Sequence, residues 1–201
     1  MKKLLIFVSV LLLCVKSYAD SPITSTEFAL AYRDVPIVNM MLNLKGEVVS
    51  DELIEYLADE KNPIDVKVAA INAVSFNRDV YAPLMQRLKI KYGTTSELTV
   101  LSEIDFSTHV ALAYARARHY YMDLREAYVL LASAFLKNSN SFTANMVYAL
   151  IATTDVMERD FCQVYQICAS IVADTTLVQD MRPQAVPMIM EYINEYAKYC
   201  K

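Results

Sequence analysis

The near absence of glycine is the strongest constraint on the fold of this chain, because only two of its 201 residues are glycine. Most β-sandwiches and barrels need glycine in their tight turns, and phosphate-binding loops need it where the backbone approaches the ligand. The composition therefore excludes most members of these classes. Hydrophobic residues make up 55% of the sequence and charged residues 21%, which excludes a disordered chain and is enough for a sizeable core.

The N-terminal segment has the pattern of a secretory signal peptide. Lys2 and Lys3 form a basic start, residues 4–15 form a largely apolar run, and the small residues Ser17 and Ala19 occupy the −3 and −1 positions of a cleavage site. The twelve residues of the run are too few to span a membrane, which needs about 20. We therefore expect cleavage after Ala19, export to the periplasm or the extracellular space, and no membrane span in the mature chain.

Two other interpretations of this segment are weaker. In a lipoprotein signal Cys14 would be acylated, but Leu12 and Leu13 precede it where small residues normally lie, and Lys16 follows closely. A buried N-terminal helix is disfavoured because two lysines begin it. The domain prediction is therefore a cleaved signal over residues 1–19 and a single all-helical domain over residues 20–201.

The net charge of the chain is acidic. Removal of the signal would change it from −4 to −7, because residues 1–19 contain three lysines and no acidic residue. Proteins that bind nucleic acid without sequence preference use a basic face that displaces counterions from the phosphates. The charge balance therefore argues against a nucleic-acid partner.

Helix start and stop signals recur at short intervals along the first half of the chain. The expected helix starts lie at Pro36, Ser50, Asn62-Pro63 and Asn77. Both glycines, Gly46 and Gly93, follow the last apolar residue of a predicted helix and are expected to end it. Pro83 lies inside the fourth of these helices, which must therefore start late or bend.

The second half continues the helical periodicity with fewer breakers. Apolar residues recur at 3.6-residue spacing from Phe106 to Tyr121. Further helices are expected to start at Asp123, at Phe142, at Asp155 and after Pro183 and Pro187. No segment alternates with period two between turn residues, and the connections are short, so neighbouring helices should be antiparallel. The fold prediction is all-α: antiparallel helical hairpins stacked as a short α-solenoid, which is preferred, or arranged as an irregular helical bundle.

Residues 51–76 resemble one hairpin of the HEAT repeat family. After an acidic turn at residues 59–63 comes the pattern Val66-Lys67-x-x-Ala70-x-x-x-Val74, where the family has Val-Arg-x-x-Ala-x-x-x-Leu. A fainter similarity to a tetratricopeptide unit rests on Ala115, Ala127, Leu131 and Ala134. The resemblance implies a stack of paired helices with a surface that binds proteins or peptides, and it implies no chemistry.

Basic residues are densest near position 118. The cluster consists of Arg116, Arg118, His119 and Arg125, interleaved with Tyr114, Tyr120 and Tyr121. These residues could form a pocket for an anionic or aromatic ligand, through bidentate arginine contacts and aromatic stacking. The competing interpretation is an ion-pair network with Asp123 and Glu126. It is preferred because Arg116 and Arg118 point about 160° apart on a helix and cannot jointly hold one small anion.

The sequence offers no motif for a metal or a nucleophile. His109 and His119 lie about 280° apart around one predicted helix, so they do not share a face. Asp105 precedes His109 by four residues, where a solvated ion pair or hydrogen bond is expected. Nucleophile motifs such as G-x-S-x-G are missing from the sequence. We therefore expect no catalytic residue, no metal and no cofactor.

Export would place three cysteines in a compartment where disulfides persist. Cys168 lies on the apolar face of a predicted helix and has the position of a buried thiol. If the last two helices form an antiparallel hairpin, Cys200 lies roughly 7 Å along the axis from Cys162 and roughly 16 Å from Cys168. A frayed C-terminus can cover only the smaller distance. We therefore predict a Cys162–Cys200 disulfide, with Cys168 free and buried, over the alternative of three reduced cysteines.

These observations favour an exported, non-catalytic binding or scaffold protein whose helical surface recognises a protein or peptide partner. One alternative is a small enzyme or an anionic-ligand binder centred on Arg116, Arg118, His119 and Tyr120. Another is a passive structural subunit of an envelope assembly. A contiguous exposed apolar or tyrosine-rich patch would support the first hypothesis, and a pocket with convergent polar groups would support the second.

Overall fold

The computed structural model of the protein describes residues 21–44 and 49–201, and this part of the chain is helical. It contains eleven α-helices and two 3₁₀ helices, and its only β-type pairing is an isolated bridge between Ser141 and Val178. The α-helices are α2 (Pro22–Ser25), α3 (Pro36–Leu42), α4 (Asp51–Ala58), α5 (Ile64–Ala73), α6 (Tyr81–Lys91), α7 (Glu97–Glu103), α8 (Phe106–His119), α9 (Arg125–Lys137), α10 (Phe142–Val156), α11 (Phe161–Ala173) and α12 (Ala185–Asn194). The 3₁₀ helices are η1 (Phe28–Tyr32) and η2 (Ala197–Tyr199). The all-α prediction is confirmed for the residues described.

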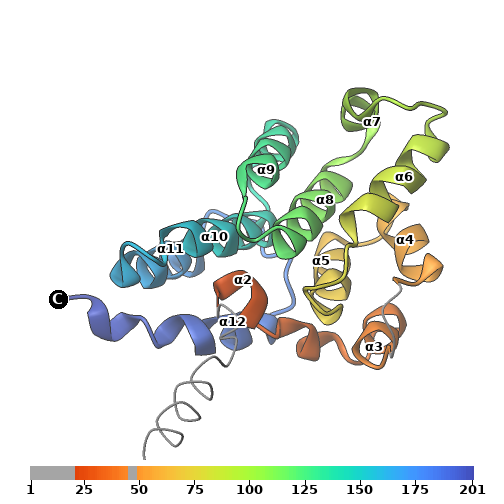
Figure 1. Ribbon diagram of the computed structural model, residues 1–201. Helices are drawn as coiled ribbons and strands as arrows, with labels where there is room; N and C mark the ends of the chain where they lie inside the picture. The colour runs from red at the N-terminus through yellow and green to blue at the C-terminus, as the bar shows by residue number, and fades with distance from the viewer. Residues whose placement is uncertain (1–20, 45–48) are drawn as a thin grey trace, which may run out of the picture.

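Helix α8 lies at the centre of the fold. It contacts α4, α5 and α6 on one side and α9 and α10 on the other (Figure 1). Residues 108–115 of this helix are all buried, and four alanines in it, at positions 111, 113, 115 and 117, let neighbouring helices approach closely. The buried apolar side chains of the described residues form one continuous core around it.

Helices α5 and α8 lie side by side and run in the same direction. The start of α5 meets the start of α8, where the Lys67 ammonium donates to the Ser107 hydroxyl. The end of α5 meets the end of α8, where the Arg118 guanidinium donates to the Val74 carbonyl. By contrast, α8 and α9 are antiparallel neighbours, because Lys137 at the end of α9 donates to the Ile104 carbonyl just before α8.

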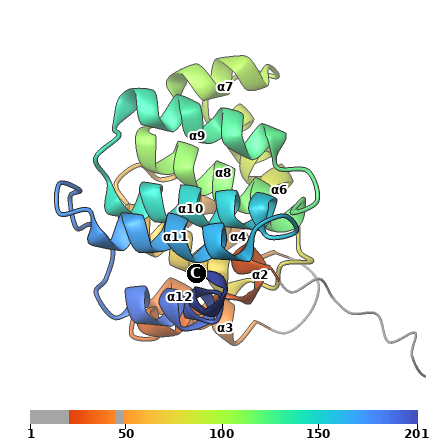
Figure 2. The ribbon, with the colours of Figure 1, turned by 90° about the vertical axis from the view of Figure 1, so that its left-hand side faces the viewer.

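The C-terminal helix returns to the beginning of the described chain. Helix α12 packs against η1 and α2, and it also contacts α11 (Figures 1 and 2). The Arg182 guanidinium, in the segment before α12, donates to the Ala31 carbonyl and lies over the Tyr32 ring. A linear stack of repeats keeps only neighbouring units in contact. The contact of α12 with η1 and α2 therefore favours an irregular bundle over a linear solenoid.

Several helices have a side-chain cap at their N-terminus. The Ser50 hydroxyl accepts from the backbone N–H of Leu53, as expected for a cap of α4. Asp105 caps α8 and Ser141 caps α10 in the same way. Gly93 follows α6 with φ +61°, the left-handed conformation that favours glycine after a helix end. Gly46, the other expected helix stop, lies outside the described residues, as does the expected signal over residues 1–19.

Several predicted boundaries are wrong. The fourth helix begins at Tyr81 rather than Asn77, which is the late start that the position of Pro83 predicted as one of two alternatives, because proline is tolerated in the first turn of a helix. Asp155 lies in the last turn of α10 and does not start a helix. Helix α11 starts instead at Phe161, where Asp160 accepts from the backbone N–H of Gln163.

Two other predicted signals act differently from expectation, and three elements were not predicted. Asp123 precedes α9 by two residues and holds the Arg125 side chain and N–H, while Leu124 occupies the N-cap position. Pro63 is the residue before α5 rather than its first residue. The elements α2, η1 and α7 have no counterpart in the sequence prediction, because each is too short to show a helical period by itself.

The C-terminal segment is joined covalently to α11. Cys162 in the first turn of α11 forms a disulfide with Cys200, which follows η2, and their Cα atoms are 4.8 Å apart. The pairing predicted from the antiparallel hairpin is therefore the one that the structure contains. Cys168 is free and fully buried, and burial raises the pKa of its thiol to about 12.

Removal of the disulfide should destabilise the protein in a redox-dependent way. The bridge closes a loop with a sequence separation of 38 residues, for which loop-closure entropy gives about 2–4 kcal/mol. We expect C162A/C200A to lower the free energy of unfolding by this amount in urea titrations. Reductant should destabilise the wild type and the matched control C168A but leave the double variant unchanged. The disulfide would be contradicted if reductant left the free energy of unfolding of the wild type unchanged, or if the denatured wild type had three alkylatable thiols.

Candidate functional site

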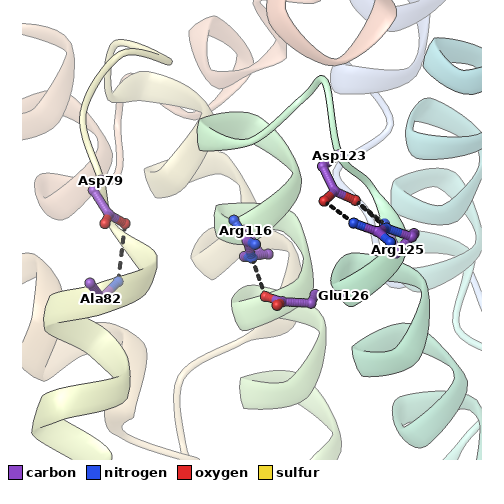
Figure 3. A network of polar contacts seen from close by, with 6 residues as sticks. All are labelled: Asp79, Ala82, Arg116, Asp123, Arg125 and Glu126. Carbon is purple, nitrogen blue, oxygen red and sulfur yellow. Dashed lines mark hydrogen bonds and ion pairs between the residues drawn. The ribbon is translucent and has the colours of Figure 1, made fainter.

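The predicted anion-binding cluster lies at the C-terminal end of α8. Arg116 is in the last turn of this helix and points toward α9, where its guanidinium forms an ion pair with Glu126 (Figure 3). The Arg116 guanidinium also lies 3.5 Å from the centroid of the Tyr120 ring and 5.7 Å from that of the Tyr81 ring. The positive charge is therefore neutralised by one carboxylate and covered by two aromatic rings.

The second arginine of the cluster points elsewhere. Arg118 is 6% exposed, and its guanidinium donates to the backbone carbonyls of Asn72 and Val74 at 2.9 and 3.0 Å. These carbonyls belong to the last turn and the C-cap of α5, which has no further helical N–H to satisfy them. Arg118 therefore caps α5, and both of its terminal nitrogens donate to the protein backbone.

A buried amide extends this contact to the N-terminal segment. The Asn72 amide nitrogen donates to the Thr26 carbonyl and to the Tyr114 hydroxyl oxygen, each at 2.9 Å. Its amide oxygen accepts from the Ala29 N–H at 2.9 Å. One side chain of α5 therefore joins α8 to the segment that contains η1, and Arg118 holds the end of α5 beside it.

The four predicted residues do not converge on one pocket. Arg116, His119 and Tyr120 are neighbours, with the His119 and Tyr120 rings 4.4 Å apart edge to face, whereas Arg118 faces the end of α5. Arg116 pairs with Glu126 and Arg125 pairs with Asp123, so two arginines of the predicted cluster have the predicted acidic partners (Figure 3). The geometry thus matches the ion-pair interpretation for Arg116 and Arg125 but not for Arg118, and it gives Arg116 and Arg118 no shared anion site.

His109 has a different environment from the one predicted. The sequence indicates a solvated contact with Asp105, but the imidazole is fully buried, and burial lowers its pKa. Its Nδ1 lies 3.2 Å from the Asp105 backbone carbonyl rather than from the carboxylate. The carboxylate is turned toward the N-terminus of α8, where it accepts from the Ser107 hydroxyl and the Thr108 N–H. His109 is therefore a core residue.

Lys67 forms a buried polar cluster that sequence reasoning missed. Its side chain is fully buried, and the ammonium donates to the Ser107 and Thr108 hydroxyls at 2.8 and 3.0 Å. Burial lowers the pKa of Lys67 to about 8, and the nearby Asp105 opposes that shift. Since both hydroxyls donate to Asp105 and accept from Lys67, the lysine serves as a donor here and not as a base for Ser107.

Among the residues that the structure describes, no group of three or more His, Cys, Asp or Glu side chains could hold a metal ion. Within residues 21–44 and 49–201, no helix is both long and apolar enough to cross a membrane.

The outward side of α9 is apolar, although it lies opposite the core. The buried side of the helix consists of Ala127, Leu130, Leu131 and Ala134. The opposite side consists of Arg125, Val129, Ala132 and Leu136, which we call the α9 outer face. Val129 is 63% exposed and Leu136 is 91% exposed, so these apolar side chains have no cover within the described chain. A helix that is apolar on two opposite sides has one side available for a partner.

Three aromatic side chains border the α9 outer face. Tyr148 of α10 contacts Tyr128 and Phe135 of α9, with ring centroids 6.1 and 6.0 Å apart, and we call these three residues the aromatic edge. Tyr148 is 40% exposed. The exposed apolar surface of α9 therefore continues onto rigid aromatic rings, which are frequent at protein interfaces.

Comparison with known proteins gives no further assignment: no family model, curated protein or solved structure matches this chain.

Loss of the Arg118 guanidinium should destabilise the fold. Arg118→Met leaves two buried carbonyls without donors, and we expect the free energy of unfolding to fall by about 2–4 kcal/mol. The matched control is Arg125→Met, because the Arg125 side chain is 89% exposed and pairs only with Asp123. Urea denaturation should show a lower midpoint for the first variant and an unchanged one for the second. Equal midpoints for both variants would contradict the capping role.

The buried Lys67 should make stability depend on pH between 8 and 10.5. The unfolded lysine has its ordinary pKa of 10.5 and the folded one a pKa of about 8, so in this range the unfolded state binds more protons and stability rises with pH. We expect the stability of wild type relative to Lys67→Met to increase by up to about 3 kcal/mol across the range.

The variant comparison separates Lys67 from other titrating groups. The raised thiol pKa of Cys168 and the raised phenol pKa values of Tyr81 and Tyr128 lower stability above their usual pKa, but they do so equally in both proteins. Lys61→Met, at an exposed position, should give a flat difference from wild type. A flat or falling difference for Lys67→Met would show that Asp105 outweighs the effect of burial.

Proposed function

We propose that the protein is an exported, non-catalytic binding protein that recognises another protein through the α9 outer face. The observation that carries this proposal is the exposure of Val129 and Leu136 on the side of α9 opposite its core contacts. Exposed apolar patches bordered by polar residues often mark protein interaction sites, because burial against a partner removes apolar surface from water. The aromatic edge supplies rigid contact area beside the patch.

The remaining parts of the proposal rest on the sequence and on the polar residues of the site. Export is supported by the basic start, apolar run and small cleavage-site residues of positions 1–19. A catalytic role has no support from the basic cluster, because the guanidinium groups of Arg116 and Arg118 point to different partners. The hydroxyl of Ser107 accepts from the Lys67 ammonium and already donates to the Asp105 carboxylate, so it has no support as a nucleophile.

A photo-crosslinking amino acid at position 136, expressed in the native host, tests the proposal. We expect a discrete crosslinked species from position 136 and none from Gln86, an exposed polar position on α6. Val129→Glu should lower the crosslink yield about tenfold, because a charge is then buried in the contact. A crosslinked species of twice the chain mass would identify the partner as a second copy.

The export part of the proposal is tested by intact mass spectrometry, which should show that the protein begins at Asp20.

The proposal fails if position 136 gives no adduct, or if Gln86 gives the same adducts in equal yield. Far-ultraviolet circular dichroism of Val129→Glu must match that of wild type, since Val129 is on the solvent side of its helix. Retention of residues 1–19 on the protein isolated outside the cytoplasm would remove the cleavage part alone.

A further inference from the structure

A second surface of the molecule contains a partly enclosed apolar cavity. It has a volume of about 350 Å³ and lies where the loop after α8 meets the end of α10, the start of α11 and Ser21. Its apolar wall consists of Tyr121, Met122, Leu124, Met157 and Phe161. Met122 is 78% exposed and Phe161 is 43% exposed, so large apolar side chains face solvent at the opening. Methionine side chains adapt to different apolar groups, which suits a wall that receives a ligand.

The polar groups around this cavity favour a positive charge. Asp155 and Glu158 line it at the C-terminal end of α10, where the helix dipole also favours cations. Asp155 already pairs with Arg159 at 2.9 Å, whereas no ion pair of Glu158 is found among the residues that the structure describes. None of the described residues that line the cavity is lysine or arginine. Glu158 is therefore the carboxylate available to a ligand.

The hydroxyls of Ser21 and Thr154, which also line the cavity, have partners within the protein, and that of Ser21 lies 2.9 Å from the Thr24 hydroxyl. The Thr154 hydroxyl donates to the Leu150 carbonyl at 2.9 Å and accepts from the Ile23 N–H at 3.3 Å. These two hydroxyls therefore offer little to a neutral polar ligand. The ligand that this cavity suits has an apolar group for the wall and a cation for Glu158.

We propose that this cavity binds a peptide segment that inserts one large apolar side chain and presents an adjacent lysine or arginine to Glu158. A volume of about 350 Å³ is at the low end for ligand sites, which suits a single side chain rather than a whole cofactor. The charge complementarity between Glu158 and a basic residue selects a cationic peptide over an acidic one. The cavity shares no residue with the α9 outer face, so this inference goes beyond the proposed function and is tested separately.

The methyl signals of Met122 and Met157 provide a direct test. We label the full chain, as purified from an export-competent host, with ¹³C-methyl methionine and assign these signals with Met122→Leu and Met157→Leu. The probe is acetyl-Phe-Lys-amide, and its comparison peptides are acetyl-Phe-Glu-amide and acetyl-Gly-Lys-amide. We expect saturable shifts of both methyl signals with the first peptide, and binding at least about fivefold weaker with the other two.

A charge variant and a matched control complete the test. Glu158→Gln should weaken binding of acetyl-Phe-Lys-amide about fivefold and remove the preference over acetyl-Phe-Glu-amide. Glu103→Gln, an exposed acid on α7, should change neither. No saturable shift up to about 10 mM peptide, where even weak millimolar binding would appear, would overturn the proposal. Equal affinity for the lysine and glutamate peptides would overturn it too.

Two other occupants of the cavity have their own signatures. If a second copy of this chain fills it, the Met122 and Met157 signals will change with protein concentration in the absence of peptide. If the chain's own N-terminal residues before Ser21 fill it, these signals will differ between processed and unprocessed protein, and added peptide will not shift them in the latter. Either result would overturn recognition of a cationic peptide.

Discussion

The guanidinium of Arg118 holds together three parts of the chain that are far apart in sequence. It caps the end of α5, it extends from α8, and the Asn72 carbonyl that it contacts belongs to the residue that binds the N-terminal segment. A buried cation is tolerated only when it is fully paired or hydrogen-bonded, since desolvation otherwise costs several kcal/mol. The arrangement of α5, α8 and η1 therefore depends on a few specific hydrogen bonds inside an otherwise apolar core.

A second buried cation fixes the other end of the same helix pair. Lys67 contacts the start of α8 through Ser107 and Thr108, while Arg118 contacts the end of α5. Two polar contacts at opposite ends define both the direction and the register of two parallel helices, which apolar packing of alanines alone would leave less specified. Arg118, a candidate ligand-binding residue in the sequence, thus stabilises the helix packing, as does Lys67.

Two surfaces of the described chain expose large apolar side chains. The α9 outer face and the cavity beside Glu158 both expose large apolar side chains, whereas the arginines of the predicted anion pocket pair with groups of the protein itself. This distribution supports binding of polypeptide partners more than chemistry on small molecules. The net charge of the chain is negative, which also favours a positively charged ligand.

The sequence by itself determined the helical class, several caps and the cysteine pairing, because these depend on local propensity and on the fixed rise per residue of a helix. Ser50 and Gly93 act as predicted, and Cys162 meets Cys200 as the hairpin geometry requires. Only the tertiary structure decided the partners of Arg118, which are 44 and 46 residues away, and the burial of Lys67 and His109. Helical periodicity places such side chains on a face, but it does not say which distant helix covers that face.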